Sequence, residues 1–218
     1  PSIRVDHLTP KVISVLERGG IKSLTIAPET ARQDLRYSIG KKVSNEAIFK
    51  VLEKIQHSKI RSLKFYFLLG LPEENESDVD NIIDFLDQVS NIGFKKNQLK
   101  VSINPFIPKL NTPFEKRISH LLEENIPELK EKFKRVKQGL KKIPAVKTRM
   151  GKIKELIKSA RLQAMISLGD EDLFELLFRH YEEGGTFGAL NKVENSLDYS
   201  FDDYLKKIRG CYIPWKLK

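Results

Sequence analysis

Three segments of this 218-residue chain carry polar or conformationally special residues directly after an apolar run. Glu29 follows "KSLTIAP", Gly70 opens the turn "GLPEEN" after "SLKFYFLL", and Asn104 opens "NPFIPKLNTPF" after "QLKVSI". A carboxylate at the end of a strand can accept hydrogen bonds from two ribose hydroxyls, and glycine lets a backbone pass close to a ligand. These residues therefore suggest that a nucleotide-like ligand binds where strands end.

Each segment also has a purely structural explanation. Glu29 could serve the dipole or the amino-terminal cap of a following helix, and the turn at Gly70 could be only a tight connection between a strand and a helix. The proline-rich residues 104–114 could simply cross an edge of the fold. The basic residues after Glu29 could meet a carboxylate or phosphate, or stay solvated: Arg36, Lys41 and Lys42.

Other chemistries find little support in the residue types. A single cysteine excludes an internal disulfide framework and cannot by itself hold a zinc or iron-sulfur site. The histidines lie far apart with no ligand spacing, and no G-x-S-x-G nucleophile context is present. The residues concerned are Cys211, His7, His57, His120 and His180.

The first hundred residues alternate between strand and helix patterns, which predicts parallel βαβ units in an α/β fold. Helix signals stand between the strands: Thr9 and Pro10 begin one helix, and Ser44 begins another. Because the carboxyl ends of parallel strands collect at one rim, Glu29, the "GLPEEN" turn and residues 104–114 should share a site. The expected strands are residues 2–5, 22–27, 62–72 and 98–106, and residues 62–72 are apolar enough to be covered on both sides.

From about residue 115 the pattern becomes helical. We therefore expect two domains, residues 1–116 and 117–218, with a possible short edge strand at 145–150. Residues 126–143 form a long helix whose apolar stripe is opposite a basic face. The stripe comprises Ile126, Leu129, Phe133, Val136, Leu140 and Ile143, and the basic face Lys130, Lys132, Lys134, Arg135, Lys137, Lys141 and Lys142.

Composition indicates a folded chain with anionic partners. The hydrophobic content is 40%, the formal net charge is +10, and the pI is near 9.5. This charge favours anions, including RNA, although lysine-rich surfaces also serve solubility. No run of eighteen apolar residues and no secretory signal pattern is present, so we expect a cytoplasmic protein with no membrane association.

Several stretches resemble the second half of the barrel of radical S-adenosylmethionine (radical SAM) enzymes. They are "SIRVDHLTP", "GGIKSLTIAPET", "DLRYSIGKK", "LKFYFLLGLPEE" and "VSINPFIPKLNTPF". The resemblance is strongest to the branch with a preceding cobalamin-binding-type domain, and the tail "SARLQAMISLGDEDLFELL" and "IPWK" resembles that branch's carboxyl-terminal extension, apart from Leu168, where the branch has Arg. It implies a partial TIM-like (β/α) barrel of parallel strands, followed by a mainly helical extension.

The resemblance also implies roles for individual residues. Glu29 would occupy the strand-exit position associated with the ribose of S-adenosylmethionine. The resemblance also assigns Arg36 and Ser23 to the cofactor site, on weaker matches. The turn that passes the adenine would be Gly70, Leu71 and Pro72, and the last barrel strand would contribute Asn104 and Pro105. Two departures stand out: Glu73 replaces a glycine common in related turns, and "APETAR" lacks a common Gly-Ser pair.

The family holds a 4Fe-4S cluster with three cysteines in a C-x-x-x-C-x-x-C loop, which this sequence lacks. We therefore expect the carboxyl-terminal part of a longer enzyme, or a short protein that works with a cluster-bearing chain. Alone it should neither hold the cluster nor cleave S-adenosylmethionine. Cobalamin use by a full-length protein stays open.

Partners and alternative functions follow from these features. The missing amino-terminal radical SAM segment or a partner chain would complete the barrel, and an open sheet edge at residues 2–5 could pair two copies into a homodimer. The alternative is a basic RNA-binding accessory module built on residues 126–143. A third interpretation makes this helix a structural element that merely packs against the barrel.

Overall fold

The structure, a computed structural model, describes residues 3–210 and divides into two compact units. Unit 1 comprises Pro1–Asn104 and Glu131–Met150, and unit 2 comprises Pro105–Lys130 and Gly151–Lys218. These bounds differ from the expected division at residue 116, because residues 131–150 return to the sheet of unit 1. Cys211 and the "IPWK" segment lie outside the described residues.

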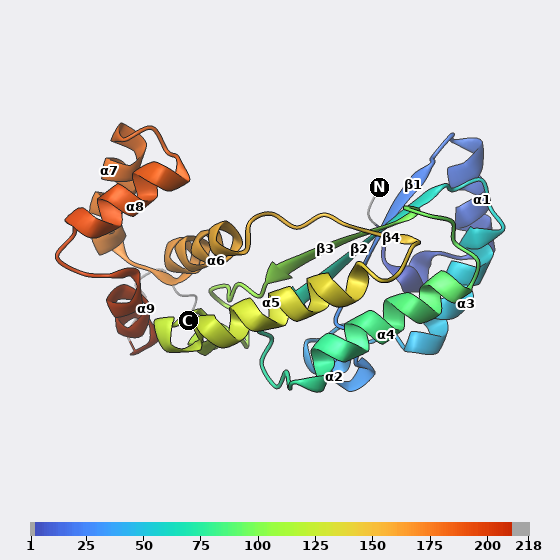
Figure 1. The fold of residues 1–218 in the computed structure, drawn as a ribbon, viewed down its shortest axis with the longest axis horizontal. Helices are drawn as coiled ribbons and strands as arrows, with labels where there is room; N and C mark the ends of the chain where they lie inside the picture. Colours follow the sequence, from blue (N-terminus) through green and yellow to red (C-terminus); the bar gives the residue numbers. More distant parts are fainter. Residues whose placement is uncertain (1–2, 211–218) are drawn as a thin grey trace. The chain divides into compact units, whose positions relative to one another are not determined.

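Unit 1 is built on a four-stranded sheet with the strands in the order β1-β2-β3-β4 (Figure 1). β1 pairs with β2 in parallel and β3 pairs with β4 in parallel, while Leu63 N donates to Gln98 O at 2.9 Å between β2 and β3. The predicted α/β class with parallel strands is thereby confirmed. The strands are β1 Ser23–Glu29, β2 Ser62–Leu69, β3 Leu99–Pro105 and β4 Val146–Thr148.

Two helices of unit 1 begin at the caps that the sequence predicts. The Thr9 side chain accepts from Val12 N at 3.3 Å, and the Ser44 side chain accepts from Ala47 N at 3.1 Å. Each bond satisfies a backbone N–H that the first turn of a helix leaves unpaired. The helices are α1 Pro10–Arg18, α2 Gln33–Ser38, α3 Asn45–Gln56, α4 Ser77–Asn91 and α5 Ile126–Leu140, of which α2 was not predicted.

The strand predicted at residues 2–5 is wrong for the part that the structure describes. Ile3 N donates a single backbone hydrogen bond to Thr25 O, at 3.4 Å, and the 3₁₀ helix η1 (Val5–His7) then turns the chain away. Val5 is buried and η1 contacts α3, so burial of this side chain competes with further pairing along β1. The fourth strand of the sheet is instead β4, which lies in residues 145–150, where we expected a possible short edge strand.

The two faces of the sheet differ in burial, so β2 is not covered on both sides as predicted. Leu63, Phe65, Phe67 and Leu69 are buried, and the residues between them are only half-buried. The buried face packs against α3 and α4, where the Phe85 ring lies 6.0 Å from that of Phe67. The helices α3, α4 and α5 lie on this side of the sheet (Figure 1).

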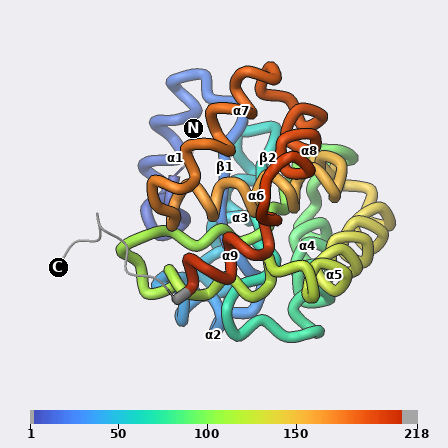
Figure 2. The backbone as a smooth tube through the Cα atoms, turned by 90° about the vertical axis from the view of Figure 1, so that its left-hand side faces the viewer, coloured from blue at the N-terminus to red at the C-terminus, as the bar shows by residue number. Residues whose placement is uncertain are grey.

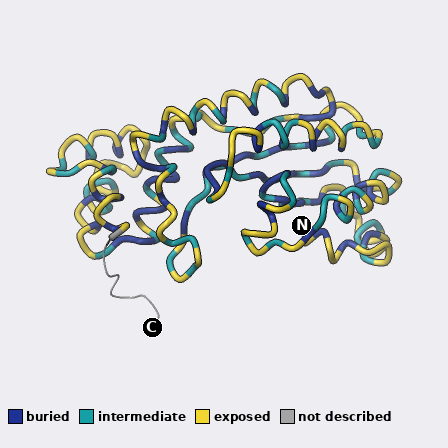
Figure 3. The backbone as a smooth tube through the Cα atoms, turned by 90° about the horizontal axis from the view of Figure 1, so that it is seen from below, coloured by how far each residue is buried: buried dark blue, intermediate teal, exposed yellow. Residues whose placement is uncertain are grey.

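The predicted apolar stripe of α5 is confirmed as a core face. Its residues through Ile143 are all buried, and Figure 3 shows buried residues along the strands and on one side of the helices. At Gly139 a Cβ atom would lie 2.3 Å from Ile83 Cδ1, so α4 and α5 approach closely there. The burial of this stripe shows that α5 packs against the fold through its apolar face.

Unit 2 is helical, as predicted for the carboxyl-terminal extension (Figure 2). Buried Phe201 lies beside Arg161, whose guanidinium is 5.8 Å from the ring centroid and 2.8 Å from Glu123. No helix among residues 3–210 is long and apolar enough to cross a membrane. The helices are α6 Ile153–Leu168, α7 Phe174–Glu182, α8 Phe187–Ser196 and α9 Phe201–Gly210, with the 3₁₀ turns η2 Ser119–Leu121, η3 Glu123–Asn125 and η4 Glu171–Leu173.

We expect Phe133→Ala to lower the free energy of unfolding by about 3 to 5 kcal/mol, because it removes a fully buried ring and leaves a cavity. Urea unfolding followed by circular dichroism measures the change. The matched control is Gln138→Ala on the exposed side of α5, which should change the same free energy by less than about 0.5 kcal/mol. Similar small effects in both variants would show that α5 does not belong to the core.

Candidate functional site

The exits of β1 and β2 lie at one rim of the sheet. Glu29 is the register partner of Phe67, and Gly70, three residues after Phe67, directly follows the end of β2. β3 is the next strand, and its half-buried Asn104 stands one residue before the end. The structure therefore brings these strand ends together, as parallel pairing requires.

Glu29 holds an unusual backbone conformation at the end of β1. Its φ is 68°, in the left-handed region, and the β1–β2 register shifts between Ile26 and Glu29. Such a conformation costs a residue other than glycine about 1 to 3 kcal/mol and is often found at ligand sites. Glu29 Oε1 accepts from Lys41 Nζ at 2.7 Å, and Lys41 also donates to Ala27 O. The carboxylate is a quarter exposed, so it remains accessible at the rim.

Arg36 lies beneath the Glu29 loop and is fully buried. Its guanidinium donates to Thr30 O at 2.7 Å and Val43 O at 2.9 Å, and also to Pro28 O and Ala31 O. Burial lowers its pKa to about 10. These bonds tie up the donors of Arg36 within the protein, so its effect on a ligand would be indirect, through the shape of the loop.

Arg32 connects the exits of β1 and β2, a role that the sequence analysis missed. Its Nε and one terminal nitrogen donate to the two oxygens of Asp78 at 2.8 and 3.1 Å, and it also donates to Glu73 O at 2.7 Å. Asp78 is 2% exposed and also accepts from Asn75 N. The acidic first turn of α4 hinted at Asp78, but nothing local identifies a partner 46 residues away.

The "GLPEEN" turn is held by a buried carboxylate. Glu74 Oε2 accepts from Gly70 N at 2.9 Å and from Leu71 N at 3.4 Å, and Oε1 lies 2.9 Å from Lys132 Nζ. Burial raises the pKa of Glu74 above its ordinary value, although Lys132 and the backbone N–H groups oppose this shift. Gly70 has φ 83°, so the turn itself gives a reason for glycine there, apart from any ligand.

The other predicted contacts around the rim differ in accessibility. Leu71 is 5% exposed and Pro105 is also buried, whereas Pro72 and Asn104 are half-buried. Ser23 stands at the opposite end of β1 from Glu29, so the structure does not bring it to this rim. Pro72 and Asn104 are therefore better placed than the others for direct contact with a ligand.

The residues of this chain do not fit an iron-sulfur cluster. Among residues 3–210 no three His, Cys, Asp or Glu side chains are grouped so as to hold a metal ion. The whole sequence has one cysteine, whereas the cluster of the resembling family needs three thiolates. A cluster at this rim would need cysteines from outside these 218 residues.

Residues 1–86 match the family model described as the radical SAM superfamily, which supports the resemblance over this part of the chain. The chain is also similar to the uncharacterized protein MJ0966 of Methanocaldococcus jannaschii, with 28% identity over 215 residues. The match covers 99% of this chain and 43% of that protein. The chain thus spans less than half the length of this relative. Neither comparison supports the assignment to a cobalamin-associated branch.

Glu73 occupies the position where related turns often have glycine, and its φ is 65°. We expect Glu73→Gly to raise the free energy of unfolding by about 0.5 to 1 kcal/mol, because relief of the left-handed strain exceeds the added freedom of the unfolded chain. The bond from Arg32 to the residue 73 carbonyl is retained, since it involves only the backbone. Urea unfolding measures the change.

The matched control is Glu53→Gly, in the exposed part of α3, which should lower the free energy of unfolding by about 1 kcal/mol. A loss of stability in both variants would mean that the Glu73 side chain stabilises the turn more than its backbone strain destabilises it.

Proposed function

We propose that this chain is the carboxyl-terminal part of a radical SAM barrel, which contributes S-adenosylmethionine and substrate contacts. The match of residues 1–86 to the superfamily supports this function, together with the parallel strands that end at one rim. The cluster would come from protein outside these residues, either covalently attached or as a partner chain. Cobalamin use by a full-length protein and pairing of two copies through the β1 edge are separate proposals.

The observation that carries the proposal is the carboxylate of Glu29. It stands at a strand exit, a quarter exposed, on a backbone that is strained and fixed by the Arg36 bonds below it. A carboxylate in this setting fits the two hydroxyls of the S-adenosylmethionine ribose. The adenine would lie along Gly70 to Pro72, and Asn104 would offer an amide at the neighbouring strand end. When bound at a reduced cluster, S-adenosylmethionine supplies radical chemistry.

We expect adenosine to bind the chain about tenfold more tightly than 2′,3′-dideoxyadenosine, because the analogue lacks the two hydroxyls that would donate to Glu29, which then keeps only its bond from Lys41. Ligand-observed NMR titration measures both affinities. Glu29→Gln should reduce the difference to about threefold or less, whereas Glu53→Gln on α3 should leave it unchanged. Equal affinity of the two nucleosides for the unaltered chain would overturn the role of Glu29.

The chain alone should be inactive, because it cannot supply three cluster thiolates. After anaerobic reconstitution with iron and sulfide, we expect iron well below stoichiometric amounts and no cleavage of S-adenosylmethionine. Stoichiometric iron and sulfide bound to the purified chain would contradict this part of the proposal.

An RNA-binding module built on α5 remains the alternative, with less support. Several of its basic residues face acids of the protein: Lys132 pairs with Glu74, Arg135 with Asp80, and Lys134 with Glu131. Cations that already have partners release fewer counterions when they meet phosphates. The contacts of α5 therefore favour a packing role over an RNA surface.

A further inference from the structure

The sheet face opposite α3, α4 and α5 carries a row of lysines. Lys100 of β3 and Lys147 of β4 are register partners. The bond from Leu63 N to Gln98 O fixes the β2–β3 register and places Lys64 of β2 beside Lys100. Because neighbouring strands are about 4.8 Å apart, the three lysine backbones span a row about 10 Å long.

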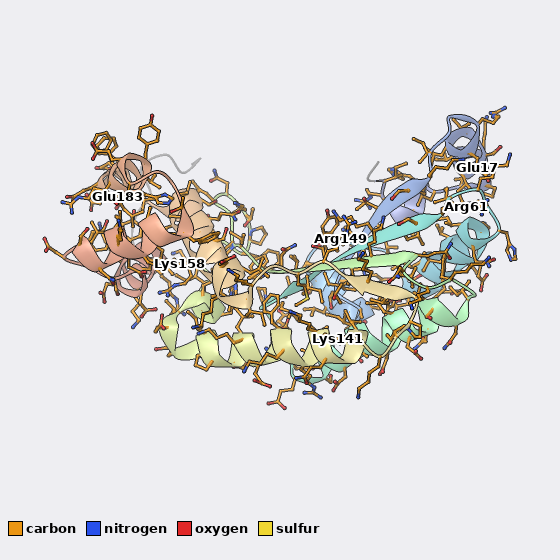
Figure 4. All side chains as sticks on the ribbon, turned by 45° about the horizontal axis from the view of Figure 1, so that its top comes forward. Glu17, Arg61, Lys141, Arg149, Lys158 and Glu183 are labelled. Carbon is orange, nitrogen blue, oxygen red and sulfur yellow. The ribbon has the colours of Figure 1, made fainter. Side chains whose placement is uncertain are left out.

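No acid lies next to this lysine row within the sheet. β2, β3 and β4 contain no Asp or Glu, and within residues 3–210 none of the three lysines forms an ion pair. Lys64 Nζ lies 4.7 Å from the centroid of the Tyr66 ring, a contact that leaves its charge uncompensated. Arg149, labelled in Figure 4, is exposed just after β4, where its N–H donates to Val101 O at 2.7 Å.

Three cations on the helix side of unit 1 are paired with acids. Lys132 lies 2.9 Å from Glu74, Arg135 pairs with Asp80, and Arg32 pairs with Asp78. Like charges side by side on neighbouring strands repel each other, so the lysine row destabilises the isolated sheet. An anion bound to the face that carries the lysine row would remove this repulsion. The cations on the helix side that pair with acids are already neutralised.

We propose that the lysine row, Lys64, Lys100 and Lys147, binds a small ligand that carries two or more linked phosphate groups. Lysine ammonium groups bind phosphate as compact point charges. A single carboxylate would neutralise one lysine and leave the others, whereas linked phosphates place several negative charges along the row. The row ends at β4 after three lysines, so its length suits a small oligophosphate.

This site is separate from the ribose position at Glu29. Lys64 is the third residue of β2 and Lys100 the second residue of β3, so the row crosses the amino-terminal part of the sheet. At about 3.3 Å per residue, Phe67, the register partner of Glu29, lies about 10 Å further along β2 than Lys64. An oligophosphate bound here therefore does not require adenosine at the rim.

Calorimetric titration of tripolyphosphate into the 218-residue chain tests the proposal. We expect binding that weakens as salt rises, and a loss of about tenfold or more in a variant with Lys64→Gln, Lys100→Gln and Lys147→Gln. The matched control carries Lys137→Gln, Lys141→Gln and Lys142→Gln near the end of α5, so it loses the same charge elsewhere. The control should bind tripolyphosphate within about twofold of the unaltered chain.

Thermal unfolding shows whether the variant with all three lysines of the row replaced, called the open-face variant, is folded. At low salt it should unfold at the same or a higher temperature than the unaltered chain, because the repulsion along the row is gone. Tripolyphosphate should raise the unfolding temperature of the unaltered chain and of the control, but not that of the open-face variant.

Equal losses of affinity in the two triple variants would overturn the proposal in favour of general charge attraction. Binding of a single-stranded RNA oligonucleotide without binding of tripolyphosphate would overturn it in favour of a polymer. The proposal is also distinguishable from the role of Glu29: Glu29→Gln should not alter tripolyphosphate affinity, and the open-face variant should keep the preference for adenosine over its dideoxy analogue.

Discussion

The ion pair between Arg32 and Asp78 is the interaction on which the candidate site depends. Asp78 is almost wholly buried, and a buried carboxylate without a partner is costly. The planar guanidinium meets both of its oxygens and also a carbonyl of the "GLPEEN" turn. One side chain from the exit of β1 therefore fixes the turn at the exit of β2, while the pairing of β1 with β2 places Glu29 and Gly70 at one rim.

Around this pair, both loops are shaped by polar groups turned toward the protein. Arg36 donates hydrogen bonds to backbone carbonyls beneath Glu29, and Glu74 accepts hydrogen bonds from backbone N–H groups at Gly70 and Leu71. Opposite charges thus organise two adjacent loops, each by satisfying the kind of backbone group that the turn leaves unpaired. The left-handed conformations of Glu29 and Glu73 persist because these bonds over-determine the loops.

Side chains alternate between the two faces of each strand, so the sheet of unit 1 has one apolar face that packs against helices and one more polar face. Residues that face α3 and α4 are buried, and those between them form a half-exposed face with lysines and hydroxyls. In a barrel such a face lines the interior, where ligands bind.

The sequence by itself determined the local elements and the class of fold. Thr9 and Ser44 predicted helix starts, and the switch between periods predicted strands at residues 22–27 and 62–72, because caps and periodicity act over a few residues. In the structure these strands are Ser23–Glu29 and Ser62–Leu69. Only the tertiary structure decided that Arg32 meets Asp78, that Lys132 meets Glu74 across 58 residues, and that residues 3–5 leave the sheet after one bond. These outcomes depend on which distant segments pack together. Distant residues compete for burial and for charged partners, and this competition leaves no periodic pattern in a single stretch of sequence.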